Sequence, residues 1–487
     1  MSRLPTSLAS VAEEYARTSW KGVHGVLEVR SPATGDVLGE VPDCGSAEAE
    51  RAADVAVGGF AQWRRQTAFD RSAVMRRWHE LIGAHREELA QLIAAEVGKP
   101  IVQARGEVDY ANQFVSWNAE EILRCQGELL ASPSRNQRLL VVQQPVGPAL
   151  GITPWNFPAA MVTRTVAPAL AAGCSMVLKP AEQSPLTALV LAKLWEQAGG
   201  PPEAFQVLPC SDPRPASDVL MGDRRIRKLT FTGSQAVGML LYRRAADTMK
   251  AISLELGGHA PFLVFEDADI ETAVAEAIKC KFRYGGQTCV CTNRIYVQDS
   301  IVDDFTSAYV EQVVQLSVGD PLDEGTDVGP LIDEAGLAKV ARHVTDATSR
   351  GASALVGGHP GQGLYYEPTV LTGIDDDMDV MKEETFGPVA PLLSFRTEEE
   401  AVRMANNTPY GLSAYFWTKD VGRVFRLVEE LEAGIIGAND GVPGGSAHVP
   451  FGGVKESGVG RAGGRWGLEA FLEPKYVSLR LPASGGA

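Results

Sequence analysis

The chain has 487 residues, of which 45 are Lys or Arg and 61 are Asp or Glu, so its formal net charge at neutral pH is −16. This acidic balance argues against a broad nucleic-acid-binding surface, although a local basic pocket for an anion remains compatible with it. Residues 1–15 lack the apolar stretch of a signal peptide, and no apolar run is long enough to cross a bilayer. We therefore expect a cytoplasmic protein without nucleic-acid or membrane partners.

Residues 46–124 are expected to be mainly helical. Apolar residues recur at helical spacing from Glu48 to Trp63, Asp70 is expected to cap a second helix through Leu81, and a third runs over 104–124. Next, 139–145 alternates as a β ribbon does, and 475–481 near the end of the chain does the same. Two amphipathic strands without an obvious sheet of their own predict pairing with another subunit.

Between residues 146 and 258, short apolar strands alternate with helices, a rhythm that predicts a parallel α/β sheet. The usual three-glycine fingerprint of a dinucleotide site is missing. Gly233 and Ser234 instead stand at the end of a strand and the start of a helix, where the pyrophosphate of a dinucleotide binds. A second α/β unit follows from Ala260 to about Gly460. The length of the chain also predicts two or three domains.

Cys289 follows a glycine pair and a run of small polar residues, with Arg283 nearby. A nucleophilic thiol favours such a flexible, cationic setting, although free cysteines more often pack inertly in a core. Upstream, Glu255 lies between two leucines and before two glycines. A carboxyl group in apolar surroundings has a raised pKa and suits general-base chemistry, and the alternative is a strand-end glutamate paired with an arginine.

Several blocks in a fixed order give a more specific signal than either residue alone. They are 153–158 (TPWNFP), 231–234 (FTGS), 255–258 (ELGG), 286–289 (GQTC), 384–388 (ETFGP) and 450–453 (PFGG). With these motifs the chain resembles the aldehyde dehydrogenase superfamily nearly from end to end, and most of all its succinate-semialdehyde dehydrogenases. The resemblance implies two α/β domains with parallel sheets and a small β bridging domain that builds homodimers or homotetramers. The implied division is 1–125 with 146–257 for NAD binding, 258–460 for catalysis, and 126–145 with 461–487 for bridging.

The resemblance also implies the chemistry. Cys289 attacks the aldehyde to give a thiohemiacetal, whose oxyanion is held by the Asn156 side-chain amide and the Cys289 backbone N–H. Hydride then passes to the nicotinamide, and water activated by Glu255 cleaves the thioester that remains. Branches of the family that transfer the acyl group to coenzyme A lack this base, so Glu255 favours hydrolysis to a free acid.

For the cofactor, Lys179 and Glu182 resemble the family's adenosine-ribose contacts. A carboxylate there accepts bonds from the ribose hydroxyls and repels a 2′-phosphate, so NAD is expected, with NADP possible. A solvated ion pair on a loop is the alternative. The remaining cofactor contacts that the resemblance implies are Trp155, Gly233, Ser234, Leu256, Glu384 and Phe386.

For the substrate, Arg164 and Arg283 match the two arginines of succinate-semialdehyde dehydrogenases, and two guanidinium groups in one pocket would hold a carboxylate. Their alternative role is to pair with acidic residues on neighbouring helices. The sequence departs from that branch at two places. His259 stands where asparagine is common, and Gly444-Gly445-Ser446 replaces a serine-rich loop, which leaves Ser446 as a shifted donor to the substrate and leaves the preferred chain length open.

The seven cysteines are scattered and odd in number, which favours a reducing compartment. None has zinc-type spacing, and His79 and His85 are six residues apart, on different faces of a helix, so we predict no metal site. Cys291 lies two residues after Cys289, and we hypothesise that a reversible disulfide between them locks the enzyme; a packed, inert Cys291 is the alternative.

The sequence therefore predicts an NAD-linked oxidation of succinate semialdehyde to succinate. The alternatives within enzymes are glutarate semialdehyde or another ω-carboxylated aldehyde as substrate, or a broad-specificity aldehyde dehydrogenase. From other classes they are a catalytically silent binding protein on the same fold, and a cofactor-free cysteine hydrolase, for which no histidine is suitably placed in the sequence.

Overall fold

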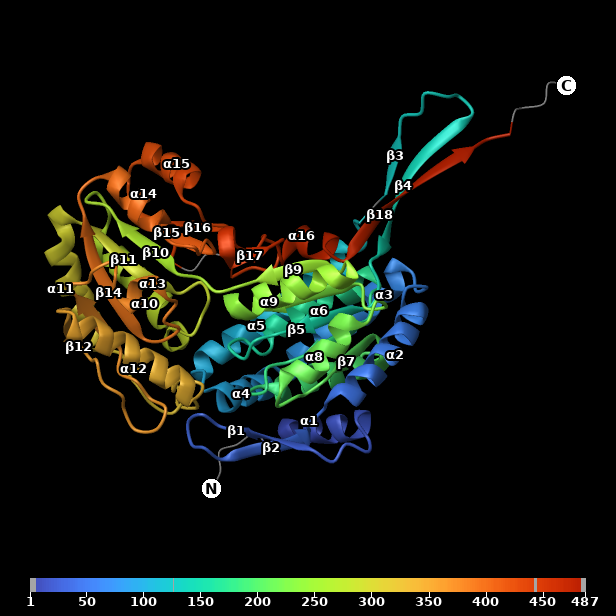
Figure 1. The fold of residues 1–487 in the computed structure, drawn as a ribbon, viewed down its shortest axis with the longest axis horizontal. Coiled ribbons are helices and arrows are strands. Elements are labelled where there is room, and N and C mark those ends of the chain that lie inside the picture. The colour runs from blue at the N-terminus through green and yellow to red at the C-terminus, as the bar shows by residue number, and fades with distance from the viewer. Residues whose placement is uncertain (1–5, 126, 442–444, 483–487) are drawn as a thin grey trace.

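The computed structural model describes residues 6–125, 127–441 and 445–482 (Figure 1). Gly444, singled out above in the substrate loop, lies outside the described residues, as do 1–5 and 483–487 of the predicted terminal segments. Two helix-flanked sheets lie side by side, and a small third sheet projects from the body (Figure 1). This is the α/β fold with a small β unit that the sequence predicts.

The first large sheet has six strands in the order β17-β9-β8-β5-β6-β7. Its strands are β5 (Ala149–Ile152), β6 (Met176–Lys179), β7 (Phe205–Val207), β8 (Lys228–Thr232), β9 (Ala251–Glu255) and β17 (Gly458–Val459). All neighbours are parallel except β17, which runs antiparallel to β9. Because β5 is flanked by β6 on one side and by β8 on the other, the order reverses there. The carboxyl ends of β5 and β8 therefore open the crevice in which ligands of such sheets bind.

Side chains of this sheet alternate between two cores, as the two-residue period of a strand requires. On β5, Ala149 packs in one core and Leu150 in the other, and on β6 Met176 and Val177 divide in the same way. The first core contains helices α3 (Ala68–Ala84), α4 (Arg86–Val97), α5 (Ile101–Glu121), α6 (Ala160–Ala172) and α7 (Pro185–Gln197). The second contains α2 (Ser46–Trp63), α8 (Pro213–Gly222) and α9 (Gln235–Ala245).

The second large sheet has seven strands in the order β12-β13-β14-β11-β10-β15-β16. They are β10 (Ala260–Val264), β11 (Thr292–Gln298), β12 (Ser353–Val356), β13 (Thr369–Thr372), β14 (Val389–Phe395), β15 (Ser413–Trp417) and β16 (Ile435–Ala438). Only β12 is antiparallel to its neighbour. The accompanying helices are α10 (Ile270–Phe282), α11 (Val302–Val313), α12 (Glu334–Ser349), α13 (Asp379–Lys382), α14 (Glu398–Asn406) and α15 (Val421–Glu430).

The projecting sheet corrects one expectation. Strand β4 (Gln137–Pro145) pairs antiparallel with β18 (Leu472–Arg480) along its whole length and with the short β3 (Glu128–Leu130). The two amphipathic segments therefore do have a sheet of their own. The residues of β18 after Leu472 and Glu473 are exposed, since the ribbon leaves the body of the protein (Figure 1).

A second expectation, the cap of the helix that begins near residue 70, also differs in the structure. The cap of α3 is Thr67, whose hydroxyl accepts from the Asp70 backbone N–H, while the Asp70 carboxylate accepts from the Thr67 N–H. Asp70 is thus the third residue of a capping box rather than the cap itself. The remaining α-helices and strands are α1 (Thr6–Ser19), the β1 (Val26–Arg30) and β2 (Val37–Pro42) hairpin, and α16 (Gly464–Glu469).

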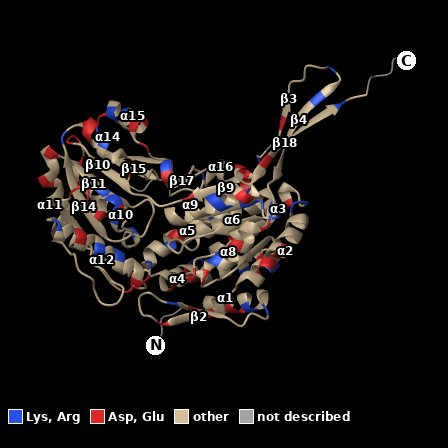
Figure 2. Ribbon diagram, in the orientation of Figure 1, with Lys and Arg blue, Asp and Glu red and all other residues tan. Residues whose placement is uncertain are grey.

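Basic and acidic residues are interspersed over both helix-flanked sheets (Figure 2). In the part of the chain that the structure describes, no helix is both long and apolar enough to span a bilayer.

Candidate active site

Cys289 lies where two cavities meet. A cavity of about 490 Å³ is lined by residues of both helix-flanked units, among them Asn156, Glu255 and Glu384. A second cavity, of about 310 Å³, is lined by a different set that includes Arg164 and Arg283. Cys289 and Met161 belong to both walls. We call the first the cofactor cavity and the second the substrate cavity.

The turn that delivers Cys289 follows α10 directly. Tyr284 and Gly285 both adopt left-handed backbone conformations, with φ of 52° and 59°. A tyrosine in this region is uncommon, and its backbone and side chain are both held: its N–H donates to Gln103 Oε1 at 2.7 Å and its hydroxyl donates to the Val97 carbonyl at 2.5 Å. These two bonds therefore fix the turn at Tyr284 to helices α4 and α5.

The environment of the thiol differs from the expected one. Burial raises the pKa of Cys289 to about 12, and Arg164 is the main group that acts in the opposite direction. Because Cys289 still opens to both cavities, it is reachable, but at neutral pH it is a thiol rather than a thiolate. Attack on an aldehyde therefore requires a base that takes the thiol proton.

Glu255 has the properties expected of it. It ends β9 and is buried, its Oε2 has no hydrogen-bond partner, and burial raises its pKa to about 8, with Arg164 and Arg461 lowering it in part. It makes none of the ion pairs found among the described residues, so the alternative of a paired strand-end glutamate does not hold. A carboxyl group with this pKa exchanges protons near neutral pH.

Asn156 is buried in the loop that follows β5. Its side-chain Nδ2 donates to the Gln287 carbonyl at 2.9 Å, which ties this loop to the turn before Cys289. A primary amide has two N–H donors, so one remains for a ligand in the cofactor cavity, which Asn156 lines.

The predicted cofactor residues lie along two connected spaces. Trp155, Gly233 and Ser234 line both the cofactor cavity and a further one of about 590 Å³, which reaches Lys179 and Glu182. A Cβ atom at Gly233 would lie 2.5 Å from the Phe231 ring, so a larger residue there would require that ring to move. Ser234 is the N-cap of α9, and Lys179 Nζ lies 3.0 Å from Glu182. This extended space at the strand-order reversal has the shape and the N–H donors that a dinucleotide needs.

At the other end of this space, Leu256, Glu384 and Phe386 line the cofactor cavity. Glu384 accepts from the Gly258 N–H at 2.9 Å, and burial raises its pKa to about 7. Phe386 has a φ of 57° and meets Trp155 edge-on, with ring centroids 5.6 Å apart. The residues present therefore fit a nicotinamide dinucleotide.

Among the described residues, the two arginines of the substrate cavity form no ion pair with an acidic side chain. Arg164, on α6, is only 4% exposed; its Nη2 donates to Met161 Sδ at 2.9 Å and its guanidinium carbon lies 4.1 Å from the Phe451 ring centroid. The Arg283 Nε is buried without a hydrogen-bond partner. Since neither belongs to an ion pair among the described residues, the predicted alternative of pairing with acidic helices is wrong. Their charge is available to an anion in the cavity.

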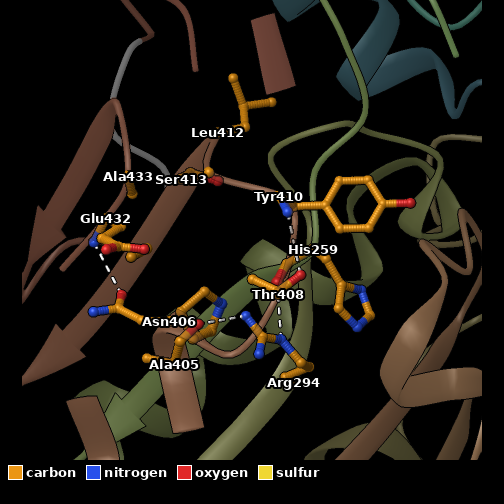
Figure 3. A pocket seen from close by; sticks show the side chains of 13 residues that line it. His259, Arg294, Ala405, Asn406, Thr408, Tyr410, Leu412, Ser413, Glu432 and Ala433 are labelled. Atoms are coloured by element: carbon orange, nitrogen blue, oxygen red, sulfur yellow. Dashed lines mark hydrogen bonds between the residues drawn. The ribbon is translucent and has the colours of Figure 1, made fainter. Parts of the chain in front are cut away.

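Two further predicted residues lie elsewhere. Gly445, rather than Ser446, lines the substrate cavity, and the Ser446 hydroxyl bonds to His448 Nδ1 at 2.5 Å. His259 lies in a separate pocket of about 10 Å³, room for about one water molecule, beside Arg294 and Tyr410 (Figure 3). Its Nε2 bonds to the Met381 carbonyl at 3.0 Å, and burial lowers its pKa. Neither side chain reaches the substrate cavity in this structure.

Cys291 is buried, and its Sγ lies 3.3 Å from the Thr292 carbonyl oxygen and 3.5 Å from that of Lys281, either of which can accept its single S–H. Burial raises its pKa, and Lys281 lowers it in part. Cys289 and Cys291 are both free.

Sequence reasoning missed Tyr110, Lys99 and Glu107, which all line the substrate cavity. Tyr110 lies beside Arg164, and burial raises the pKa of its hydroxyl. These residues come from the helical region before the large sheets, where a lysine and a glutamate eight residues apart resemble ordinary helix-surface charges. Their burial depends on tertiary packing alone.

Comparison with known proteins matches residues 20–477 to the aldehyde dehydrogenase family. The chain is 47% identical to a glutarate-semialdehyde dehydrogenase of Pseudomonas putida, over 93% of this chain and 94% of that one. It is 46% identical to an NADP-dependent succinate-semialdehyde dehydrogenase of Escherichia coli, over 93% and 94%. The solved structure of a succinate-semialdehyde dehydrogenase from Burkholderia pseudomallei superposes with a TM-score of 0.92 at 47% identity, covering 94% of this chain and 95% of that chain.

Proposed function

Since the chain belongs to the aldehyde dehydrogenase family, we propose that it oxidises an ω-carboxylated semialdehyde to the diacid, with succinate semialdehyde as the leading substrate and NAD(P) as the cofactor. One observation carries this proposal: Arg164 and Arg283 line the same cavity as Cys289, and among the described residues neither forms an ion pair with an acidic side chain. Burying a guanidinium without a counter-ion is costly, so such a pocket favours an anionic ligand. The relatives named for succinate and glutarate semialdehydes agree with this substrate class.

In the proposed reaction, the substrate carboxylate binds Arg164 and Arg283, which points its aldehyde carbon at Cys289. Glu255 takes the thiol proton as sulfur bonds to the carbonyl carbon, and the resulting oxyanion is held by Asn156 Nδ2 and the Cys289 N–H. A bound nicotinamide, held near Glu384 and Phe386, would supply the acceptor for the hydride of the former aldehyde carbon. Glu255 releases that proton to solvent and, as a carboxylate again, removes a proton from water, whose oxygen attacks the thioester; the Cys289 thiolate then leaves and takes the proton from Glu255.

Lys179 and Glu182 are proposed to hold the adenosine ribose, and Glu384 and Phe386 the nicotinamide end. The Glu182 carboxylate would repel a 2′-phosphate, which supports a preference for NAD over NADP. The Escherichia coli relative is NADP-dependent. The preference for NAD or NADP is therefore set by residues at the cofactor site and not by membership of the family.

We also propose a homodimer or homotetramer, in which β18 and β4 of the projecting sheet contact a second copy. Their exposed apolar residues support this, Tyr476 and Leu479 among them. The division into a cofactor domain (1–125 and 146–257), a catalytic domain (258–460) and bridging segments (126–145 and 461–487) is part of the same proposal. A cytoplasmic location is supported by the seven free cysteines.

The test is the initial rate of NADH formation with succinate semialdehyde, glutarate semialdehyde and the uncharged butanal, in the unmodified protein and in Arg283→Ala. We expect higher initial rates with the carboxylated substrates than with butanal, and we expect Arg283→Ala to remove most of that difference. Arg76→Ala is the matched control, because Arg76 pairs with Glu120 at the surface. If butanal is oxidised as well as the semialdehydes and Arg283→Ala changes little, the protein is a broad-specificity aldehyde dehydrogenase. No oxidation of any aldehyde would favour a silent binding protein on this fold.

A further inference from the structure

A buried ion pair lies beside the chain segment that follows Asn156. Lys99 and Glu107, 1% and 3% exposed, form a direct ion pair at the wall of the substrate cavity. Lys99 lies between α4 and α5, and Glu107 lies on α5. Replacing a buried pair with apolar residues often costs nothing or is stabilising, so burial alone does not account for it. Its other contacts indicate what it does.

Both partners reach across to the segment 156–160, which connects Asn156 to the start of α6. Lys99 Nζ donates to the Asn156 carbonyl oxygen at 2.7 Å and lies 3.6 Å from the Phe157 ring centroid. Glu107 Oε1 accepts from the backbone N–H groups of Ala159 and Ala160 at 2.9 and 3.3 Å. The pair therefore holds both ends of this short segment.

The start of α6 has no side-chain cap of its own. The N-cap of α6 is Ala159, whose methyl side chain cannot accept a hydrogen bond from the first backbone N–H groups of the helix. Glu107 supplies that acceptor from another helix, with its negative charge at the helix N-terminus. One turn further along α6 is Arg164, and just before the segment is Asn156.

Lys99 also contacts the turn on the other side of the nucleophile. Its Nζ lies 4.5 Å from the ring centroid of Tyr284, the residue with a left-handed backbone just before the Cys289 loop. The ammonium group thus sits between the chain segment that carries Asn156 and the turn that carries Cys289, and a cation between two aromatic faces is attracted to both.

We propose that Lys99 and Glu107 are positioning residues for catalysis: the pair fixes segment 156–160 so that the Asn156 amide faces the reacting centre beside Cys289. The inference rests on the oxyanion role proposed above for Asn156, and it is independent of the substrate's carboxylate. Because a shift of about 1 Å in such a group lowers the rate by about 10²-fold, the pair should matter to catalysis without touching the aldehyde.

The test is a double-mutant cycle on kcat/KM with butanal, an uncharged aldehyde whose binding does not depend on Arg164 and Arg283. Lys99→Met should lower kcat/KM by about 10²-fold in the unmodified protein and by less than about threefold in the Asn156→Ala background, because residues that act through one another are strongly non-additive. Arg86→Ala is the control: it removes an exposed pair with Asp109 that joins α4 to α5 and should leave kcat/KM unchanged.

Equal losses in both backgrounds would overturn the inference, as would unchanged kcat/KM in Lys99→Met. If Asn156→Ala itself retains activity, the role of Asn156 is wrong and the inference falls with it, whereas a poor preference for semialdehydes leaves it intact. Should Lys99→Met fail to fold by circular dichroism, the same cycle is run with Lys99→Met/Glu107→Gln, which removes both charges and keeps an amide oxygen to accept from Ala159 and Ala160. The same non-additivity is expected there.

Discussion

The pH dependence of the reaction gives a direct test of the proposed base. Burial raises the pKa of Glu255 to about 8, so the carboxylate that can accept a proton is scarce below that pH and abundant above it. With this pKa the ionised fraction is about 9% at pH 7 and about 91% at pH 9. We therefore expect kcat/KM for butanal to rise about tenfold between pH 7 and pH 9 and to level off above, since kcat/KM reports the free enzyme.

Removing the charge of Arg164 should move this profile. Arg164 is the first of the two cations that lower the pKa of Glu255, so Arg164→Met should shift the midpoint to higher pH. Butanal is used because a carboxylated substrate would itself neutralise the guanidinium. The measurement is kcat/KM at half-unit steps from pH 6 to 10, with protein integrity checked at each pH by return to pH 8 before assay.

Two results would refute this reasoning. A midpoint near 4.5, the ordinary value for a glutamate, would mean that the cavity is wetter than its burial indicates. A midpoint that stays the same in Arg164→Met would mean that the titrating group is not Glu255 or that the guanidinium does not act on it.

Three more predictions concern Glu255, Glu182 and Cys291. Because the folded-state pKa of Glu255 is raised, ionisation of this group destabilises the fold as pH rises from about 4.5 to about 8. Glu255→Gln should therefore raise the free energy of unfolding in urea by up to about 5 kcal/mol at pH 9 and leave it unchanged at pH 4. Equal effects at both pH values would contradict this. Glu182→Ser should raise the ratio of kcat/KM for NADP to that for NAD by about tenfold or more, because a repulsive carboxylate is removed; an unchanged ratio would place the 2′-phosphate elsewhere. After mild peroxide, dithiothreitol should restore the activity of the unmodified protein but not of Cys291→Ala, in which Cys289 lacks a partner and oxidises further; activity that stays lost in the unmodified protein would exclude the disulfide.

Sequence motifs were sufficient for the parts of the site that lie within a few residues of one another or at strand ends. Glu255 at the end of β9 and Gly233 after β8 lie where the alternation of strands and helices places them. The burial of Arg164 without a partner could not be predicted, because a helical arginine has many possible acidic neighbours and only packing decides which are near. The same holds for Ser446, whose hydroxyl bonds within its own loop.

The thiol of Cys289 illustrates a different limit. Its neighbours in the sequence are small, polar or cationic, and they suggested easy ionisation. The pKa is raised instead because the burial comes from residues distant in the sequence, on the walls of both cavities. Lys99 and Glu107 were missed for a related reason, since nothing in a helical stretch distinguishes a charge that will be enclosed from one that will face water.

The short strand β17 has a consequence for how the enzyme is made. Gly458 pairs with Glu255 across the sheet edge, and the Leu256 N–H donates to the Ser457 carbonyl at 2.9 Å. The strand that carries the base is therefore completed by residues some two hundred positions later in the chain. On the ribosome, Cys289, Asn156 and the cofactor residues all emerge long before this last partner does, so the nascent chain should remain catalytically inactive until nearly all of it has been synthesised.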